Sequence, residues 1–140
     1  MGPVQNKAIT YFDVSADGSR FHAIADGELD RALYRSTDAG ITWEQFQIFT
    51  SGYTLSVSPQ DNTRVLYGQS DGLYLSTDGL ATSTKVLSND GNMSDLVFAP
   101  SNPSIVWAIT QGYVLYKSTN GGASFTQISN LRDEVLNANP

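Results

Sequence analysis

The chain contains three copies of one sequence pattern, and this repetition constrains its fold more than any other feature. The clearest copies are the segments LYRSTDAGITW, LYLSTDGLATS and LYKSTNGGASF, which begin at Leu33, Leu73 and Leu115 and align without a gap. The serine residues that they share are 40 and 42 residues apart, at Ser36, Ser76 and Ser118. Repeats of this length are supersecondary units that bury their apolar surfaces by stacking on one another. The repeat therefore decides the fold class.

Each repeat holds further short segments that match between the copies. Two of them precede the serine segment, starting at Phe12, Leu55 and Leu96 and then at Arg20, Val65 and Val106. The last one closes the repeat and starts at Trp43, Ser83 and Phe125. Glycine, proline, serine and aspartate gather between the segments, as is typical of tight turns. Each repeat therefore predicts four strands joined by three turns, and the chain is expected to be all-β.

A four-stranded unit of about 40 residues has the period of a β-propeller blade. Blades stack face to face, so their strands should be apolar on both sides, as Val65–Tyr67 and Ile105–Trp107 are. We predict one module of residues 1–140 with three four-stranded antiparallel blades, over 11–49, 53–88 and 93–129, and a C-terminal tail over 130–140. A β-solenoid is the main competing fold, but its coils are usually shorter and do not need three reversals per repeat.

The segment Ser36–Trp43 matches S-x-D-x-G-x-T-W, the Asp-box or BNR repeat, at every specified position. Ser118–Phe125 has Asn, Ser and Phe in place of Asp, Thr and Trp, and Ser76–Ser83 places its glycine one position early and lacks the aromatic residue. Three such motifs in register resemble the Asp-box propeller superfamily. Its members include sialidases, xyloglucan-type glycoside hydrolases, sortilin-like receptors and photosystem assembly factors. The resemblance therefore implies a fold and leaves the activity open.

The motif has a mechanical rationale. A short carboxylate at the start of a turn accepts hydrogen bonds from backbone N–H groups, and glycine supplies a positive φ. In the families that the chain resembles, these turns lie away from the active face. We therefore expect a structural role for the residues of the three motifs, which are Ser36, Asp38, Gly40, Thr42, Trp43, Ser76, Asp78, Thr82, Ser118, Asn120, Gly122, Ser124 and Phe125.

Candidate ligand-binding residues lie in the loops that join strand four to the next strand one, and strand two to strand three. These loops share the propeller face that usually binds ligands, and loops on a rigid scaffold often carry function. Carboxylates there suit a carbohydrate or a cation, and flat rings suit stacking on a sugar or anchoring a peptide. The candidates are Asp26, Glu28, Asp30, Tyr53, Asp90, Asp95 and Tyr113. The simpler interpretation is a solvated loop for the carboxylates and a cover over the blade ends for the tyrosines.

No catalytic residue is identified by the sequence. A glycosidase needs two carboxyl groups roughly 5 to 9.5 Å apart, and 14 acidic residues make such a pair easy to imagine and hard to identify. A sialidase needs three convergent arginines, but Arg35 aligns with Leu75 and Lys117 at a blade position. His22 is the only histidine, and laying the second strands over one another places it against Tyr67 and Trp107, so we expect a packed structural residue.

Composition excludes several other classes. With 14 acidic and 8 basic side chains, the formal net charge of −6 argues against a nucleic-acid partner. No apolar run approaches the roughly 20 residues of a membrane span, and no secretory signal is visible at the N-terminus. The absence of cysteine excludes thiol catalysis, and a single histidine excludes His-based metal sites. We predict no cofactor and no metal, and only the family resemblance favours an extracellular location.

Three blades are too few for a ring, since closed propellers have about four to eight. An isolated arc would leave two apolar blade faces bare. We expect either further blades of a longer propeller or a homodimer that closes a six-bladed ring, with Lys7–Tyr11 pairing beside Phe125–Ser129 of the second copy. The predicted function is recognition of a protein or a glycan. The alternative is a fragment of a xyloglucanase-like glycoside hydrolase that uses carboxylate catalysis, although the isolated chain is not expected to be an enzyme.

Overall fold

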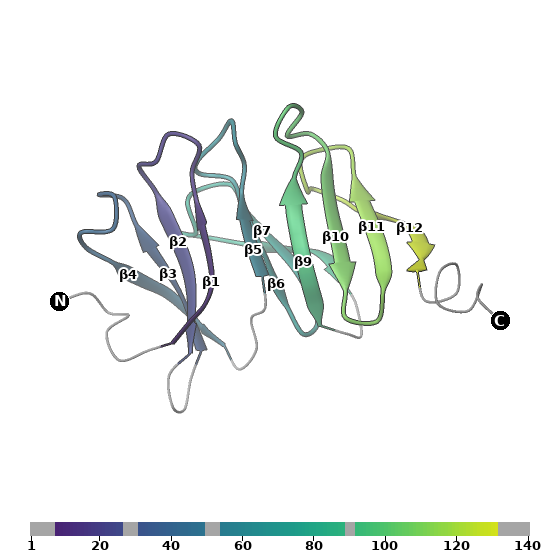
Figure 1. Ribbon diagram of the computed structural model, residues 1–140, viewed down its shortest axis with the longest axis horizontal. Coiled ribbons are helices and arrows are strands. Elements are labelled where there is room, and N and C mark those ends of the chain that lie inside the picture. Colours follow the sequence, from purple (N-terminus) through teal and green to yellow (C-terminus); the bar gives the residue numbers. More distant parts are fainter. Residues whose placement is uncertain (1–7, 27–30, 50–53, 89–91, 132–140) are drawn as a thin grey trace.

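A computed structural model of the chain describes residues 8–26, 31–49, 54–88 and 92–131. Every extended element in these ranges is a β-strand, and the strands form three four-stranded antiparallel sheets. This confirms the prediction of an all-β chain built from propeller blades. Figure 1 shows the three sheets side by side in chain order, like the blades of an incomplete propeller. The described part of the chain contains no helix long and apolar enough to cross a membrane.

Each sheet is a simple meander in which consecutive strands are neighbours. The first blade consists of β1 (Ala8–Val14), β2 (Phe21–Asp26), β3 (Arg31–Ser36) and β4 (Glu44–Phe49). The second consists of β5 (Thr54–Val57), β6 (Val65–Gln69), β7 (Gly72–Ser76) and β8 (Thr84–Ser88). The third consists of β9 (Met93–Phe98), β10 (Val106–Thr110), β11 (Val114–Ser118) and β12 (Thr126–Asn130). The first strands β1, β5 and β9 contact one another across the blades, so they form the inner edge of the arc.

The strand register defines which positions of the three blades are equivalent. The repeat serines Ser36, Ser76 and Ser118 pair with Phe21, Val65 and Val106, the first residues of the second strands. One residue further along, His22 is therefore equivalent to Leu66 and Trp107. The expected match of His22 with Tyr67 is wrong, because Tyr67 corresponds to Ala23 on the opposite face of the sheet.

Each blade has two faces, which we name by their direction in the chain. The forward face of a blade points toward the next blade, and the backward face points toward the preceding one. At the first junction, Ile24 and Leu33 of the forward face of blade 1 pack against a backward face formed by Leu55, Val57 and Tyr67 of blade 2. Side chains on both faces are buried, which explains why Val65–Gly68 of β6 shows no alternation of buried and exposed residues.

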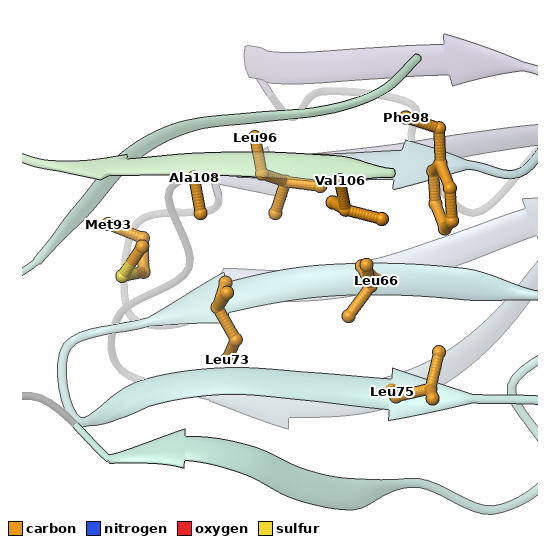
Figure 2. Close-up of a cluster of buried hydrophobic side chains, with 8 residues drawn as sticks. All are labelled: Leu66, Leu73, Leu75, Met93, Leu96, Phe98, Val106 and Ala108. Carbon is orange, nitrogen blue, oxygen red and sulfur yellow. The ribbon is translucent and has the colours of Figure 1, made fainter. Parts of the chain in front are cut away.

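The second junction contains the larger apolar core. Figure 2 shows Leu66, Leu73 and Leu75 of blade 2 pointing toward side chains that extend from β9 and β10 of blade 3. The blade 3 residues are Met93, Leu96, Phe98, Val106 and Ala108. Gly68 allows the two blades to approach closely, because a Cβ atom at this position would lie 2.7 Å from Cβ of Met93. Complete burial of one such apolar side chain stabilises a fold by about 1.5–3 kcal/mol.

The two ends of the arc remain uncovered. Phe12 and Val14 extend from the backward face of blade 1 and are 49% and 40% exposed. Val97, on the forward face of blade 3, is 51% exposed. The blades therefore do not close into a ring, as the number of repeats predicts.

The terminal segments do not fit the strand exchange expected from the sequence. Residues 8–11 belong to β1, which pairs with β2 at the inner edge of its sheet. The segment that was expected to receive them, Phe125–Ser129, contributes mainly to β12, the outer strand of blade 3. An inner strand and an outer strand lie at opposite edges of their blades. In the described residues the expected partners therefore lie at opposite edges of their blades, and Lys7 lies outside the described residues.

Candidate functional site

A groove of about 250 Å³ runs along the inner edge of the arc. Its wall is formed by β1, β5 and β9 together with the start of the turns that follow them. Most of the lining is apolar, with Phe12 and Val97 at the two ends of the wall and Pro59 and Pro100 in the turns. Asp13 and Ser56 supply polar groups from equivalent positions of β1 and β5. The groove thus combines an apolar surface with the carboxylate of Asp13 and the hydroxyl groups of Ser56 and Tyr11.

Three side chains at a second equivalent position join the blades beside this groove. The hydroxyl group of Tyr11 donates a hydrogen bond of 2.8 Å to Oδ1 of Asp95. The hydroxyl group of Thr54 donates to the same oxygen over 3.4 Å. Burial raises the pKa of Tyr11, and the nearby carboxylates of Asp95 and Asp13 raise it further. One residue from each blade therefore takes part in a single hydrogen-bonded cluster.

Asp13 connects the first two blades through the backbone. One of its carboxylate oxygens accepts a hydrogen bond of 2.8 Å from the N–H group of Val57, and the other accepts one of 2.8 Å from the N–H group of Val14. Because both oxygens are held, the carboxylate has a fixed position in the groove. A carboxylate that already accepts two backbone hydrogen bonds can still accept more, since its two oxygens have about four lone-pair sites.

The three serine turns, which we define as Ser36–Trp43, Ser76–Ser83 and Ser118–Phe125, share one hydrogen-bond pattern. In the first, the hydroxyl group of Ser36 donates to Asp38 over 2.8 Å, and the N–H group of Thr42 donates to Asp38 over 2.8 Å. Asp78 has the corresponding bonds in the second turn. In the third turn Asn120 replaces the aspartate, and its amide group donates to Ser124 over 2.8 Å.

The backbone of the turns explains the variable place of their glycine. Each turn has two consecutive residues with positive φ, at Ala39–Gly40, Gly79–Leu80 and Gly121–Gly122. A glycine at either position relieves one of the two strained conformations. Gly79, the early glycine of the second turn, therefore occupies the first of the two positions that favour glycine. The glycine of the sequence motif occupies the second position, as Gly40 does.

Arginine side chains link these turns to the preceding blade. Arg64 of blade 2 donates to the carbonyl oxygen of Gly121 over 2.7 Å and to that of Asn120 over 3.4 Å. Arg35 of blade 1 donates to the carbonyl oxygen of Gly79, and the guanidinium group of Arg20 lies against the same residue. In both junctions, an arginine of one blade thus donates a hydrogen bond to the serine turn of the next blade.

The predicted ligand-binding residues are only partly within the described residues. Asp26 ends β2 and forms an ion pair with Arg31, which lowers the pKa of its carboxyl group. Tyr113 lies in the turn between β10 and β11, has a φ of 68° and is 44% exposed. Asp95 lies in β9, in the cluster with Tyr11. The remaining candidates fall outside the described residues, and they are Glu28, Asp30, Tyr53 and Asp90.

The prolines that line the groove and the turn that carries Tyr113 lie at opposite ends of the strands. Pro59 and Pro100 follow the first strands, whereas Asp26 and Tyr113 lie at the reversals between second and third strands. In an antiparallel meander, successive turns lie at opposite ends of the sheet. Sequence reasoning therefore missed Tyr11, Asp13 and Ser56. Their repeat positions, beside and within the first segment of each repeat, were the available signal.

His22 lies between the blades and not in the groove. Its side chain is fully buried, and neither ring nitrogen has a hydrogen-bond partner. Burial lowers the pKa of His22 to about 4, and the charges of Arg35 and Arg20 contribute to this shift. The imidazole ring is therefore neutral at physiological pH. In the part of the chain that the structure describes, no group of three metal-binding side chains comes together.

Solved structures with similar folds are β-propellers. The GH74 xyloglucanase from Xanthomonas campestris superposes with a TM-score of 0.70 at 23% identity, over 87% of this chain and 23% of that chain. YCF48 from Cyanidioschyzon merolae gives 0.71 at 18% identity, over 96% and 41%. YCF48 bound to D1 peptide gives 0.63 at 14% identity, over 87% and 41%. The chain thus spans less than half of the length of these structures.

The class defined by the fold is therefore the β-propeller, represented here by three blades. No protein-family model matches the chain. No curated protein matches it either.

Proposed function

We propose that the chain is an arc of an Asp-box propeller and that it binds a segment of another protein in the groove at its inner edge. The three serine turns support the first part. In each turn the serine hydroxyl group donates to the side-chain oxygen of an aspartate or asparagine two residues later, and two consecutive residues have positive φ. Only the first turn has the full sequence motif. These hydrogen bonds lie within each turn, which supports a structural role for the side chains that the three turns share.

The main observation in favour of binding is the composition of the groove wall. Phe12, Val97 and the two prolines offer an apolar surface, and Asp13 offers a fixed negative charge. A peptide with apolar and basic side chains satisfies both features, because the apolar groups are removed from water and the cation pairs with the carboxylate. A YCF48 structure that shares the fold contains a bound peptide. A glycan is the other ligand class, with Phe12 as the stacking ring.

The carboxyl groups of the described residues favour binding over catalysis. A glycosidase needs a general acid whose pKa is raised so that it holds a proton near neutral pH. The aspartates whose pKa departs from its usual value all have a lowered pKa, and they are Asp17, Asp26, Asp38, Asp61, Asp71 and Asp78. In each, a hydrogen bond from a neighbouring side chain is the largest cause. These groups stabilise the blades in their ionised form.

A hydrolase fragment is the second candidate, and the likeness to GH74 structures is the observation that favours it. In that case the catalytic carboxylates would be completed by blades that are outside this chain. The two candidates predict different results with xyloglucan. A hydrolase releases reducing sugar, whereas a recognition arc leaves the polysaccharide intact.

Binding is tested with two synthetic peptides of equal length, one alternating apolar residues with lysine and the other with glutamate in place of lysine. Fluorescence anisotropy should show tighter binding of the lysine peptide. Asp13→Asn should weaken this binding by up to about tenfold, which corresponds to about 1.4 kcal/mol. The matched control is Asp71→Asn, which removes a carboxylate that is held by Tyr74 and Lys85 within the outer part of blade 2.

Three outcomes would contradict the proposal. Equal affinity for both peptides would exclude the role of Asp13. Binding of xyloglucan oligosaccharides without peptide binding would assign the groove to a glycan. Release of reducing sugar from xyloglucan would replace recognition with hydrolysis.

A further inference from the structure

The third serine turn contains the one Asn–Gly dipeptide of the sequence, Asn120–Gly121. Asparagine is a thermolabile residue, and the residue that follows it affects how quickly it loses its amide group. The backbone nitrogen of that next residue attacks the side-chain amide carbon, and glycine has no Cβ atom to obstruct the approach. The same asparagine occupies the position that Asp38 and Asp78 have in the other two turns. A deamidation-prone dipeptide therefore lies at the central position of the turn motif.

Deamidation at this dipeptide takes place in two steps that need only water. The backbone nitrogen of Gly121 gives up its proton and bonds to Cγ of Asn120, while the bond from Cγ to Nδ2 breaks and ammonia leaves with that proton. Water then opens the resulting succinimide ring at one of its two carbonyl carbons. Opening at Cγ gives aspartate. Opening at the backbone carbonyl carbon gives isoaspartate, in which the main chain continues through the former side chain.

The attacking nitrogen is protected in the folded chain. The N–H group of Gly121 donates a hydrogen bond of 2.8 Å to the carbonyl oxygen of Ser104, in the turn between β9 and β10. Gly121 is also buried, which limits the access of a base to this N–H group. The nitrogen can therefore lose its proton only after the turn has separated from Ser104.

The amide group that would be attacked is also held in place. Its oxygen accepts hydrogen bonds from the hydroxyl group of Ser118 over 2.8 Å and from the N–H group of Ser124 over 3.0 Å. Its nitrogen donates to the hydroxyl group of Ser124 over 2.8 Å. Although Asn120 is exposed to water, its amide group can change position only when these bonds break.

The second blade junction holds this dipeptide from the other side. Arg64 of blade 2 donates to the carbonyl oxygens of both Gly121 and Asn120, over 2.7 Å and 3.4 Å. Leu66 of the same blade lies against the next residue of the turn, Gly122. Separation of blades 2 and 3 removes all of these contacts. Such a local opening requires less free energy than unfolding of the whole chain.

We propose that Asn120 is a site of spontaneous deamidation that the closed second junction protects and that becomes reactive when this junction opens. The reaction is irreversible because ammonia is lost. Each opening of the junction therefore adds to a permanent chemical change at Asn120, and the modified fraction records how long the chain has spent in the open state.

The aspartate product is compatible with a closed turn. In the first turn, the hydroxyl group of Thr42 donates to the carboxylate of Asp38. Ser124 provides a hydroxyl group at the position equivalent to Thr42, and it can turn to donate to an aspartate formed from Asn120. This product gives the third turn the hydrogen-bond pattern of the first, so the junction can close again.

The isoaspartate product is incompatible with a closed turn. It adds one carbon atom to the main chain between Ser118 and Gly122. The N–H group of Gly122 donates a hydrogen bond of 2.9 Å to the hydroxyl group of Ser118, and this bond spans the added atom. A chain that has formed isoaspartate should therefore be unable to restore the third turn, and its second junction should be permanently weakened.

Mass spectrometry of one peptide tests the proposal. The chain is incubated in mildly alkaline buffer, either folded or in guanidinium chloride, at a concentration where circular dichroism shows β-structure for the folded sample. Trypsin then cuts after Lys117 and Arg132 and releases residues 118–132, which contain Asn120 and Asn130. Fragmentation assigns the mass increase to one of the two asparagines, and chromatography separates the aspartate and isoaspartate products.

Protection by the fold predicts a large difference in rate. Asn120 should deamidate at least tenfold faster in the unfolded chain than in the folded chain, and Asn130 should remain mostly unmodified in both. Gly121→Ala, measured in guanidinium chloride, should slow the reaction at Asn120 at least tenfold, because its Cβ atom obstructs the attacking nitrogen. The unfolded state makes this result independent of any effect of the substitution on folding.

Two substitutions at Arg64 test the role of the junction. Arg64→Ala and Arg64→Gln remove the charged donor to the third turn, and each should raise the rate at Asn120 at least threefold while circular dichroism still shows β-structure. The second substitution keeps a polar side chain and decides the result if the first prevents folding. The control Lys85→Ala removes a surface ion pair of the same blade and should leave the rate unchanged.

Three results would overturn the inference. Equal rates at Asn120 in the folded and the unfolded chain would show that the turn gives no protection. A modification mainly at Asn130 would place the reactive site elsewhere. Folded variants of Arg64 that deamidate at the rate of the unaltered chain would show that the second junction does not control the reaction.

Discussion

The hydroxyl group of Tyr11 donates a hydrogen bond of 2.8 Å to the carboxylate of Asp95, 84 residues later in the chain. The two residues lie on the first strands of the first and third blades, so this bond passes over the blade between them. Thr54 of the middle blade donates to the same carboxylate oxygen. The contact fixes the curvature of the arc at its inner edge, because it joins the two outer blades directly.

A double-mutant cycle should detect this connection. Tyr11→Phe and Asp95→Ala each remove one partner, and we expect a coupling free energy of about 0.5–1.5 kcal/mol between them in urea unfolding, as for a typical hydrogen bond. Thr54→Val should show weaker coupling to Asp95→Ala, because its bond is 3.4 Å long. A coupling free energy of zero for Tyr11 and Asp95 would mean that the contact does not persist in solution.

The arginine at the second junction should contribute measurably to stability. Arg64→Ala removes donors to two carbonyl oxygens of the third serine turn, and hydrogen bonds from charged groups contribute about 1.5–3 kcal/mol each in favourable cases. We expect a loss of about 1–2 kcal/mol in the free energy of unfolding. Lys85→Ala is the control, since its ion pair with Asp71 is at the surface and such pairs contribute about 0–1 kcal/mol. Equal losses for the two variants would argue against a special role of Arg64.

His22 should destabilise the fold in mild acid. Its pKa is lowered from 6.5 to about 4 in the folded chain, so below pH 6.5 the unfolded state binds a proton that the folded state does not. The free energy of unfolding should therefore fall as the pH decreases from 6.5 to 4. His22→Leu copies the equivalent Leu66, removes two unpaired ring nitrogens and should gain on the order of 1 kcal/mol at pH 5. An unchanged pH dependence in this variant would refute the assignment.

The serine turns should respond to a lower pH range. Hydrogen bonds from Thr42 lower the pKa of Asp38 from 3.8 to about 2, and Asp78 is shifted in the same direction by Thr82. The stabilisation by these carboxylates is present above pH 3.8 and is lost as the pH falls toward 2. The double variant Asp38→Asn and Asp78→Asn copies the third turn, which has Asn120, and should make stability less dependent on pH in this range.

The same two turns allow the contribution of the carboxylate to be separated from that of the rest of the motif. The second turn lacks the aromatic residue and has an early glycine, which predicts a smaller loss for Asp78→Ala than for Asp38→Ala. The structure gives both aspartates the same partners, so the losses in thermal unfolding should be similar. A clearly smaller loss at Asp78 would show that Trp43 and the regular glycine contribute more than the carboxylate.

The sequence was sufficient to predict the number, order and type of strands. The reason is that the turn chemistry of the repeats is local, and the serine, carboxylate and glycine positions are visible in the chain itself. The position of His22 shows the limit of this reasoning. An alignment of the second strands by residue type pairs His22 with Tyr67, whereas its true equivalent is Leu66, one residue earlier. A shift of one residue in a strand places a side chain on the opposite face of the sheet. Only the pairing with Arg35 establishes its face.

The groove could not be predicted because it depends on three strands that are distant in the sequence. Tyr11 and Asp13 carry no motif, and their importance follows from their distances to Asp95 and Val57 in neighbouring blades. Interactions between blades are therefore the part of the site that the local pattern does not contain.

The central claim is that this chain is an open arc of three blades whose two end faces must be covered. Sedimentation velocity at increasing protein concentration, together with circular dichroism of the same samples, tests it most directly. The account predicts that this chain on its own associates in the micromolar range, and that β-structure is lost when dilution produces the 15.2 kDa monomer. A compact 15.2 kDa monomer that keeps its β-structure and unfolds cooperatively at every concentration would contradict it.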